Sequence, residues 1–175
     1  MKYLSIVLSG PVAAGTTTAA KTLSQKLNLE YHSAGDFFRK YMHDHNIPLP
    51  NKEQIPDHVE RSLDEKLTTL LASRKPVVVD GLYQAYFTRN MDHVLKVLLT
   101  ADEDARIQRA LNRAQGETAE DVKKRDAAHD SKFRKLYADE NFLDPKLFDL
   151  IIDTSKITQE ETFQKIVDEF ETSAA

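Results

Sequence analysis

Two glycines five residues apart, followed by hydroxyl side chains, form the stretch with the clearest chemical potential. Residues 9–18 have the spacing Gly10-x-x-x-x-Gly15-x-Thr17, which is that of a phosphate-binding loop except that Thr16 stands where a lysine is expected. An apolar run precedes the stretch and a helical pattern follows it. A turn between a strand and a helix directs free backbone N–H groups toward one anion. The sequence therefore predicts a phosphate cradle, and the alternative is a turn that needs glycine only for its backbone angles.

The second candidate is an acid at the end of a short apolar strand. Residues 77–79 are all valine, and Asp80 and Gly81 follow them. A continuous apolar run is typical of a parallel strand that is covered on both faces. Its carboxyl end would lie beside the loop, where open α/β sheets bind their ligands. There Asp80 would hold a metal through water or orient that water, although a turn-forming Asp-Gly pair fits the spacing equally well.

Three arginines share one edge of a helix that we expect over residues 102–115. Arg106, Arg109 and Arg113 fall within an arc of about 60° at 3.6 residues per turn. Such an edge suits bidentate contacts with phosphate or stacking on a flat base. A solvated basic face is the alternative interpretation.

The next helix is charged along most of its length. Thr118 and Asp121 have the spacing of a capping box, and Arg125 and His129 then lie on one face. The apolar stripe of this helix is thin. We therefore expect the helix to be poorly anchored and to move as a lid.

Strands and helices alternate along the whole chain, which predicts a parallel sheet with helices on both faces. Two helical segments, residues 34–75 and 113–140, extend beyond the core formed by residues 1–33, 76–112 and 141–175. Both would lie at the carboxyl edge of the sheet, where they could close over a substrate. Apolar runs place the strands at residues 3–8, 29–32, 77–79, 94–100 and 150–152.

Composition excludes several classes of function. The 175 residues suit one domain with a real core, and the net charge of −4 argues against non-specific binding of nucleic acid. There is no cysteine, so disulfides and thiolate metal sites are excluded. No apolar run approaches the length of a membrane span, about 18 residues. We expect a cytoplasmic protein that does not associate with membranes.

In order along the chain, these features resemble a nucleoside monophosphate kinase, and most closely the short cytidylate kinases of the archaeal type. Adenylate kinases share part of the pattern but usually carry threonine at the position of Ala34. The stretches that carry the resemblance are the loop, Ser33-Ala-Gly-Asp-Phe-Phe-Arg39, Glu60-Arg-Ser-Leu-Asp64, Asp80-Gly81, the arginines at 106, 109, 113 and 125, and Phe148-Asp-Leu-Ile-Ile-Asp-Thr-Ser155. The resemblance implies a single kinase domain of the P-loop NTPase type, a three-layer fold whose sheet has about five strands. Residues 34–75 would be its NMP-binding segment and residues 113–140 its lid.

The resemblance also implies a role for each matching residue, in a monomer that uses ATP, Mg²⁺ and a nucleoside monophosphate. Thr17 would bind the metal, and the catalytic residues would be Asp80, Arg109, Arg113 and Arg125. ATP would be bound by Gly10, Val12, Ala13, Ala14, Gly15, Thr16, Thr17 and Thr18. The acceptor would be bound by Ser33, Arg39, Glu60, Arg61 and Asp64. The expected reaction moves the γ-phosphate of ATP to CMP or dCMP, which is mostly a matter of positioning and charge stabilisation.

Three departures from the family pattern keep other functions open. Thr16 removes one positive charge beside the transferring group. Leu82 and Gln84 stand where cytidylate and adenylate kinases, respectively, carry an acceptor-phosphate arginine, so Arg89 would have to replace it. Asp130 and Lys132 occupy lid positions that more often carry arginine. The alternatives are a kinase acting on AMP or another small molecule, and a catalytically weakened nucleotide-binding protein.

Overall fold

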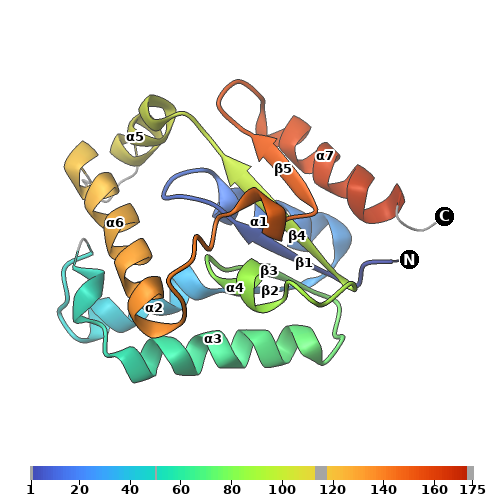
Figure 1. The fold of residues 1–175 in the computed structure, drawn as a ribbon. Helices are drawn as coiled ribbons and strands as arrows, with labels where there is room; N and C mark the ends of the chain where they lie inside the picture. Colours follow the sequence, from blue (N-terminus) through green and yellow to red (C-terminus); the bar gives the residue numbers. More distant parts are fainter. Residues whose placement is uncertain (1, 50, 113–117, 173–175) are drawn as a thin grey trace.

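Five parallel strands form the centre of the molecule (Figure 1). The computed structural model describes residues 2–49, 51–112 and 118–172. Within this part of the chain the strand order is β2-β3-β1-β4-β5, so β1 lies in the middle and the connections cross over the sheet. The strands are β1 (Ser5–Ser9), β2 (Glu30–Ser33), β3 (Val77–Asp80), β4 (Val94–Thr100) and β5 (Leu150–Asp153).

The central strands are apolar because both of their faces are covered. Ile6 and Leu8 of β1 belong to the core cluster on one face of the sheet, whereas Val7 belongs to the cluster on the other face. All three side chains are fully buried. This alternation of faces explains why a continuous apolar run, rather than an alternating one, marks each inner strand.

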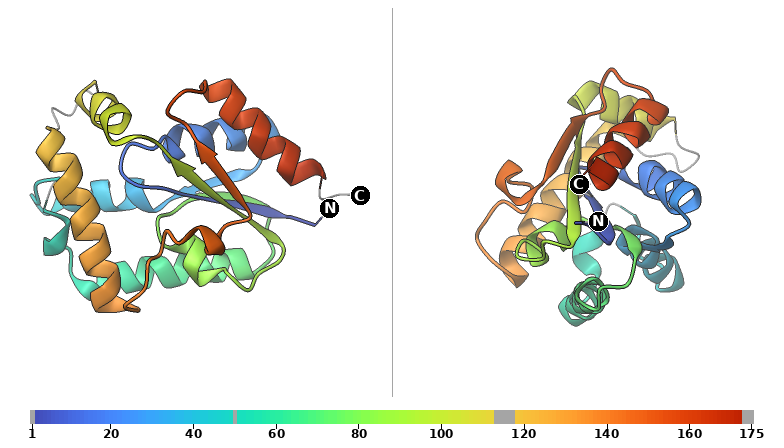
Figure 2. Two further views of the ribbon diagram at one scale, coloured as in Figure 1. Left: turned by 45° about the horizontal axis from the view of Figure 1, so that its top comes forward. Right: turned by 90° about the vertical axis from the view of Figure 1, so that its right-hand side faces the viewer.

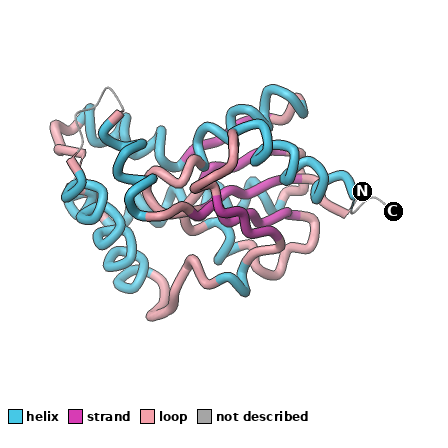
Figure 3. The backbone as a smooth tube through the Cα atoms, turned by 90° about the horizontal axis from the view of Figure 1, so that it is seen from above, coloured by secondary structure: helices cyan, strands magenta, loops and turns pink. Residues whose placement is uncertain are grey.

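Helices lie on both sides of the sheet, as the end-on and top views show (Figures 2 and 3). On one face α1 (Thr16–Leu27) packs against α7 (Gln159–Thr172). On the other face lie α2 (Ala34–Asp44), α3 (Asp57–Ala72) and the short α4 (Gln84–Phe87). The remaining helices are α5 (Glu103–Leu111), α6 (Ala119–Leu136) and the 3-10 helices η1 (Lys52–Gln54) and η2 (Pro145–Leu147). The predicted three-layer α/β architecture is confirmed.

Side-chain hydrogen bonds cap the starts of α2 and α6, and the cap of α6 was predicted. Thr118 and Asp121 form the reciprocal capping box at the start of α6. Ser33 Oγ accepts a 3.0 Å hydrogen bond from the backbone amide of Asp36 and so caps α2. Asp102 occupies the N-cap position of α5, but its side chain makes no capping hydrogen bond. Residues 113–117, where we expected the end of that helix, lie outside the described residues.

The carboxyl-terminal half of α6 is firmly packed, which corrects the expectation that this helix is poorly anchored. Phe133 is fully buried and packs with Tyr83, Tyr86 and Phe142. The ring centroids of Phe133 and these three aromatic partners lie 5.0–5.1 Å apart. A few large aromatic side chains therefore anchor a helix whose apolar stripe is narrow, because each buries so much surface. The movement of α6 as a lid stays a prediction.

Candidate nucleotide-binding site

The loop between β1 and α1 depends on glycine at both of its ends. A Cβ atom on Gly10 would lie 2.3 Å from the carbonyl oxygen of Leu99, so only glycine fits there without a backbone shift. Gly15 is the N-cap of α1 and has a φ of 102°, a conformation that other residues adopt only with strain. The loop therefore ends at the start of a helix, with the free N–H groups of the first turn of α1 at its tip.

Thr17 and Asp80 meet beside this loop, as the strand pattern predicted. The Thr17 hydroxyl donates a 2.6 Å hydrogen bond to Asp80 Oδ2. The two residues come together because β3 pairs directly with β1, with Asp80 opposite Leu8. Burial raises the pKa of the Asp80 carboxyl, and hydrogen bonds from the Thr17 and Thr16 hydroxyls offset part of that rise.

The same pair has the donor chemistry that a magnesium ion prefers. A hydroxyl and a carboxylate are hard oxygen ligands, and Mg²⁺ is commonly held by one or two such groups together with water and substrate phosphates. Among the residues that the structure describes, no group of three or more acidic or histidine side chains forms a complete protein cage. Thr17 and Asp80 therefore fit an ion that arrives with a phosphorylated ligand.

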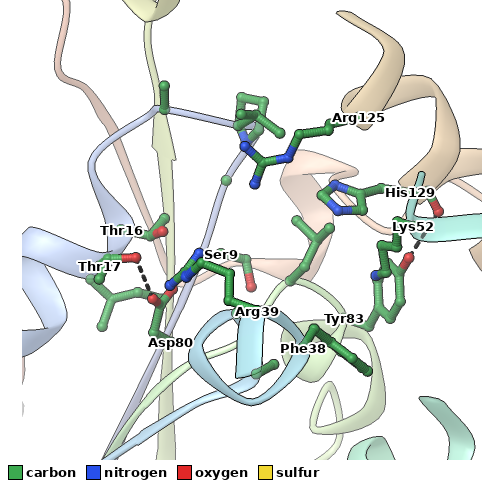
Figure 4. A pocket seen from close by; sticks show the side chains of 18 of the residues that line it. Ser9, Thr16, Thr17, Phe38, Arg39, Lys52, Asp80, Tyr83, Arg125 and His129 are labelled. Carbon is green, nitrogen blue, oxygen red and sulfur yellow. Dashed lines mark hydrogen bonds between the residues drawn. The ribbon is translucent and has the colours of Figure 1, made fainter. Parts of the chain in front are cut away.

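A pocket opens from the loop toward α2, η1 and α6, and its loop end is rich in positive charge (Figure 4). Arg39 of α2 points toward the Thr17–Asp80 pair, and Arg125 of α6 reaches in from the opposite side. Arg39 also forms a 2.5 Å ion pair with Asp36, one helical turn earlier. An anion between the loop and these arginines would meet positive charge from three elements.

The far end of this pocket combines aromatic rings with a buried carboxylate. Phe38, Tyr83, His129 and Lys52 lie together there (Figure 4). The Tyr83 hydroxyl donates a 2.9 Å hydrogen bond to the backbone carbonyl of His129. This contact joins the start of α4 to α6.

Asp64 of α3 supplies the carboxylate, and two neighbours fix its orientation. Gln84 Nε2 donates a 2.9 Å hydrogen bond to Oδ1, and the Tyr137 hydroxyl donates a 2.6 Å hydrogen bond to Oδ2. Burial raises the pKa of Asp64, and both hydrogen bonds act against that rise. The motif predicted Asp64 as a site residue, but its two partners come from distant segments and were not expected.

A second pocket lies on the other side of the loop. Ala13, Gly15 and Thr18 line both pockets, and the second is completed by α5 and the segment that connects β5 to α7. Arg109 of α5 lines it and donates hydrogen bonds to the Thr154 hydroxyl at 2.9 Å and to the Thr154 carbonyl at 2.6 Å. The loop thus separates two pockets, one on each side of its backbone.

The Asp126 carboxylate joins helix α6 to the loop. Asp126 Oδ1 accepts a 2.9 Å hydrogen bond from the Val12 backbone amide, and Oδ2 accepts one of 2.6 Å from Arg106. Arg106 also donates to the Val12 carbonyl at 3.0 Å. In this structure Arg106 therefore holds the loop and α6 together and is not an exposed basic residue.

The other contacts of α6 reach the segment around η1. Lys132 donates a 2.6 Å hydrogen bond to the Ile55 carbonyl and forms a 3.0 Å ion pair with Asp57. Lys135 forms a 2.7 Å ion pair with the other oxygen of Asp57. Lys124 donates a 2.7 Å hydrogen bond to Asn51 Oδ1. The two predicted mobile segments are therefore bonded to one another.

Several predicted site residues do not line either pocket in this arrangement. Ser33 acts as the cap of α2, Glu60 is fully buried behind the pocket wall, and Arg61 is exposed. Arg89 lies over the ring of Tyr86, 4.4 Å from its centroid, and donates to the Tyr86 carbonyl. Arg113 lies outside the described residues. Binding roles for these five residues stay predictions.

Lys52 is the main site residue that the sequence did not indicate. It lies in a segment with three prolines, residues 46–56, which reads as a connection. A lysine in such a segment is usually solvated, and no periodic pattern marks it as buried. Only the fold shows that η1 turns its side chain into the pocket, where the residue is 7% exposed.

Comparison with known proteins agrees with this geometry. A family model described as "Cytidylate kinase-like family" matches residues 5–156, which include the loop, Arg39, Asp64, Asp80 and Arg125. The chain belongs to this family. The resemblance that the motifs indicated is thereby confirmed at the level of the family.

The sequences of individual relatives align with nearly the whole chain. A cytidylate kinase of Sulfolobus acidocaldarius is 28% identical over 90% of this chain and 89% of its own length. A protein of Lacinutrix mariniflava named S-adenosylmethionine-dependent nucleotide dehydratase is 27% identical over 97% of this chain, which corresponds to 36% of that protein. The structure of shikimate kinase from Acinetobacter baumannii superposes on this chain with a TM-score of 0.63 and 18% sequence identity. The match covers 98% of this chain and 94% of the shikimate kinase chain. The fold of this family member is therefore that of the P-loop kinases.

None of the helices within the described residues is long and apolar enough to cross a membrane.

Proposed function

We propose that this protein transfers the γ-phosphate of ATP to a nucleoside monophosphate, with CMP or dCMP as the preferred acceptor. The observation that carries the proposal is the position of the loop, which lines one pocket on each side. Phosphoryl transfer needs a donor and an acceptor that meet at one anion-binding point. A loop that is shared by two pockets provides such a point. Membership of the cytidylate kinase-like family supports the choice of acceptor.

The second pocket would take the nucleoside part of ATP. Arg109 and Ile157 line it, so a flat base would meet a guanidinium group and an aliphatic side chain. The hydrogen bonds from Arg109 to Thr154 fix the orientation of the guanidinium plane. The triphosphate would then run along the loop amides toward Thr17.

The first pocket would take the acceptor with its phosphate toward the loop. Arg39 would hold that phosphate, and Arg125 would approach the transferring group from α6. Thr17 and Asp80 would hold Mg²⁺, which supplies charge neutralisation at the donor phosphates when it is bound. Because Thr16 brings no charge, the protein's cations at this point come from α2 and α6. The packed walls of the pocket would limit access of water to the transferring phosphoryl group.

A panel of acceptors tests the proposal. ADP release is measured by a coupled assay with ATP, Mg²⁺ and each of the common ribonucleoside and deoxyribonucleoside monophosphates. We expect the highest kcat/KM with CMP or dCMP. Protein that binds ATP but transfers phosphate to none of these acceptors would refute the proposal.

The same experiment addresses one alternative. The absence of the loop lysine favours a catalytically weakened protein that binds nucleotide and changes shape. Such a protein would bind ATP and CMP in calorimetry and would release no ADP above the uncatalysed rate. Transfer to a non-nucleotide acceptor alone would indicate a small-molecule kinase of the same fold.

A further inference from the structure

Lys52 is a buried cation at the far end of the first pocket, which the proposed function assigns to the acceptor. No step of the proposed reaction uses this residue. Lys52 lies at this end beside Tyr83, away from the loop (Figure 4), and Asp64 also lines this pocket. Removing an ammonium group from water is costly unless it is paired and hydrogen-bonded. Burial accordingly lowers the pKa of Lys52. Such a residue requires a structural or a functional explanation.

The protein itself satisfies Lys52 only in part. Its Nζ lies 3.4 Å from Glu60 Oε1, whereas charge-assisted hydrogen bonds are about 2.7–2.9 Å long. The rings of Phe38 and Tyr83 lie 4.8 and 5.2 Å from Nζ to their centroids. Glu60 is fully buried, and neither of its carboxylate oxygens has a hydrogen-bond partner within the described ranges. The Lys52–Glu60 pair is therefore balanced in charge but poor in hydrogen bonds.

The ammonium group retains donor capacity toward the pocket. An ammonium has three donors and no acceptor. For the part of the chain that the structure describes, we find no short hydrogen bond from Lys52 to another residue. The aromatic faces attract the charge, but they do not replace an oxygen or nitrogen acceptor.

Asp64, which lines the same pocket, supplies the opposite kind of group. Each of its oxygens already accepts one hydrogen bond, from Gln84 or from Tyr137. A carboxylate offers about four lone-pair positions, so each oxygen can accept one more. The pocket therefore presents an oriented acceptor and a cationic donor, with Phe38 and Tyr83 beside them.

We propose that Lys52 is a specificity-determining residue that binds the base of the acceptor nucleotide. In cytosine an exocyclic amine lies next to a ring nitrogen and a carbonyl oxygen. Asp64 would accept from the amine, and Lys52 would donate to the ring nitrogen or the carbonyl oxygen. In uracil a carbonyl oxygen replaces the amine and would face the Asp64 carboxylate, which is repulsive. This inference rests on the proposed function, because it deepens the assignment of the acceptor pocket.

The test replaces the ammonium without changing the bulk of the side chain. Lys52→Met leaves Glu60 as an unpaired buried charge and is therefore studied together with the charge-balanced double variant Lys52→Met/Glu60→Gln. We expect either variant that folds to lose about 10- to 100-fold in kcat/KM for CMP, the range for a hydrogen bond to a charged group. The KM for ATP should stay within about twofold, and the preference for CMP over UMP should narrow.

Lys96→Met is the matched control. Lys96 is another buried lysine, 5% exposed, that pairs with Asp149 at 3.0 Å and lines neither of the two pockets. Its loss should lower stability and leave the constants for CMP unchanged in the folded protein. Calorimetric titration of CMP into each variant without ATP gives a second readout that does not depend on turnover.

The outcomes separate the two proposals. If the wild type phosphorylates CMP and the folded double variant does so with the same kcat/KM and the same CMP preference, the role of Lys52 is overturned and the proposed function stands. If the wild type binds CMP through Lys52 but transfers no phosphate, the proposed function fails and the role of Lys52 stands. If the wild type neither binds nor phosphorylates CMP, both are overturned.

Discussion

The carboxylate of Asp126 accepts a hydrogen bond from the backbone amide of Val12, so α6 is bonded directly to the phosphate loop. The same carboxylate pairs with Arg106, whose side chain is only 12% exposed. Replacing Asp126 with alanine would remove the carboxylate partner of a largely buried guanidinium group and of a loop amide. Asp126 thus adds hydrogen bonds to the apolar packing of Val122 against Val12 and Ala13.

We expect Asp126→Ala to lower the free energy of unfolding by about 1–3 kcal/mol, the cost of leaving such groups unsatisfied. Urea-induced unfolding measures this change. Lys123→Ala is the control. Lys123 of α6 pairs with Glu103 of α5, just as Asp126 of α6 pairs with Arg106 of α5, but the side chains of Lys123 and Glu103 are both more than half exposed. Lys123→Ala should change the free energy of unfolding far less, because solvent screens an exposed ion pair. Equal losses for the two variants would contradict the structural role of Asp126.

Arg39→Ala should affect the acceptor far more than ATP. Arg39 points to the end of the first pocket beside Thr17 and Asp80. We expect kcat/KM for CMP to fall by about 10- to 100-fold, while the KM for ATP changes little. The exposed neighbour Lys40, which pairs with Asp44, is replaced by alanine as the control. Steady-state kinetics with each substrate varied in turn decide the matter, and an equal loss for both substrates would exclude the assigned role.

Thr16→Lys should restore a cation to the loop. Thr16 begins α1 beside the Thr17–Asp80 pair, so an added ammonium group would lie near the donor phosphates. We expect tighter ATP binding by about 3- to 10-fold, in line with one additional charge-assisted contact. Gln25→Lys, which adds the same charge at an exposed position of α1, should change nothing. Unchanged ATP affinity and catalysis in Thr16→Lys would mean that Mg²⁺ and the arginines already replace the missing charge.

The stability of the protein should fall as the pH drops below about 6.5, in part because of His129. Burial in the pocket, together with the positive charges of Lys52 and Arg125, keeps the pKa of His129 well below its usual 6.5. The unfolded chain therefore binds a proton in a range where the folded protein does not. It follows that stability rises with pH through this range, with a slope of at most about 1.4 kcal/mol per pH unit from this group.

His129→Asn should make that pH dependence less steep. Urea unfolding of the wild type and the variant between pH 5 and 7.5 gives the difference in slope, and other titrating groups cancel in the comparison. Identical slopes for the two proteins would show that His129 does not carry a depressed pKa.

Much of the fold follows from the sequence because burial on both faces leaves a clear pattern. The predicted strand at residues 94–100 coincides with β4, and the predicted capping box at Thr118 begins α6. The position of Asp80 beside the loop could also be predicted from the sequence, because the carboxyl ends of parallel strands lie at the same edge of the sheet. These features depend on local pattern and on topology, and both can be read without coordinates.

The rest depends on contacts between segments that are distant in sequence. Nothing local indicates that Lys52 is buried, or that Gln84 and Tyr137 meet at Asp64. The short α4 has too few residues to show a helical period. The anchoring of α6 was underestimated because Phe133 inserts among aromatic residues from two other segments. The sequence shows that the apolar face of a helix is narrow, but it does not show which residues that face packs against.

The contacts of α6 have a consequence for the time course of turnover. Asp57 binds two lysines of this helix, Val12 binds Asp126, and Asn51 binds Lys124. If a substrate can leave only when α6 separates from the loop and from η1, every cycle must break these bonds after the chemistry is complete. We therefore expect product release to limit the steady-state rate, and rapid mixing to show a burst of ADP whose amplitude approaches one equivalent per enzyme molecule. A linear time course from the first turnover would place the slow step at or before phosphoryl transfer.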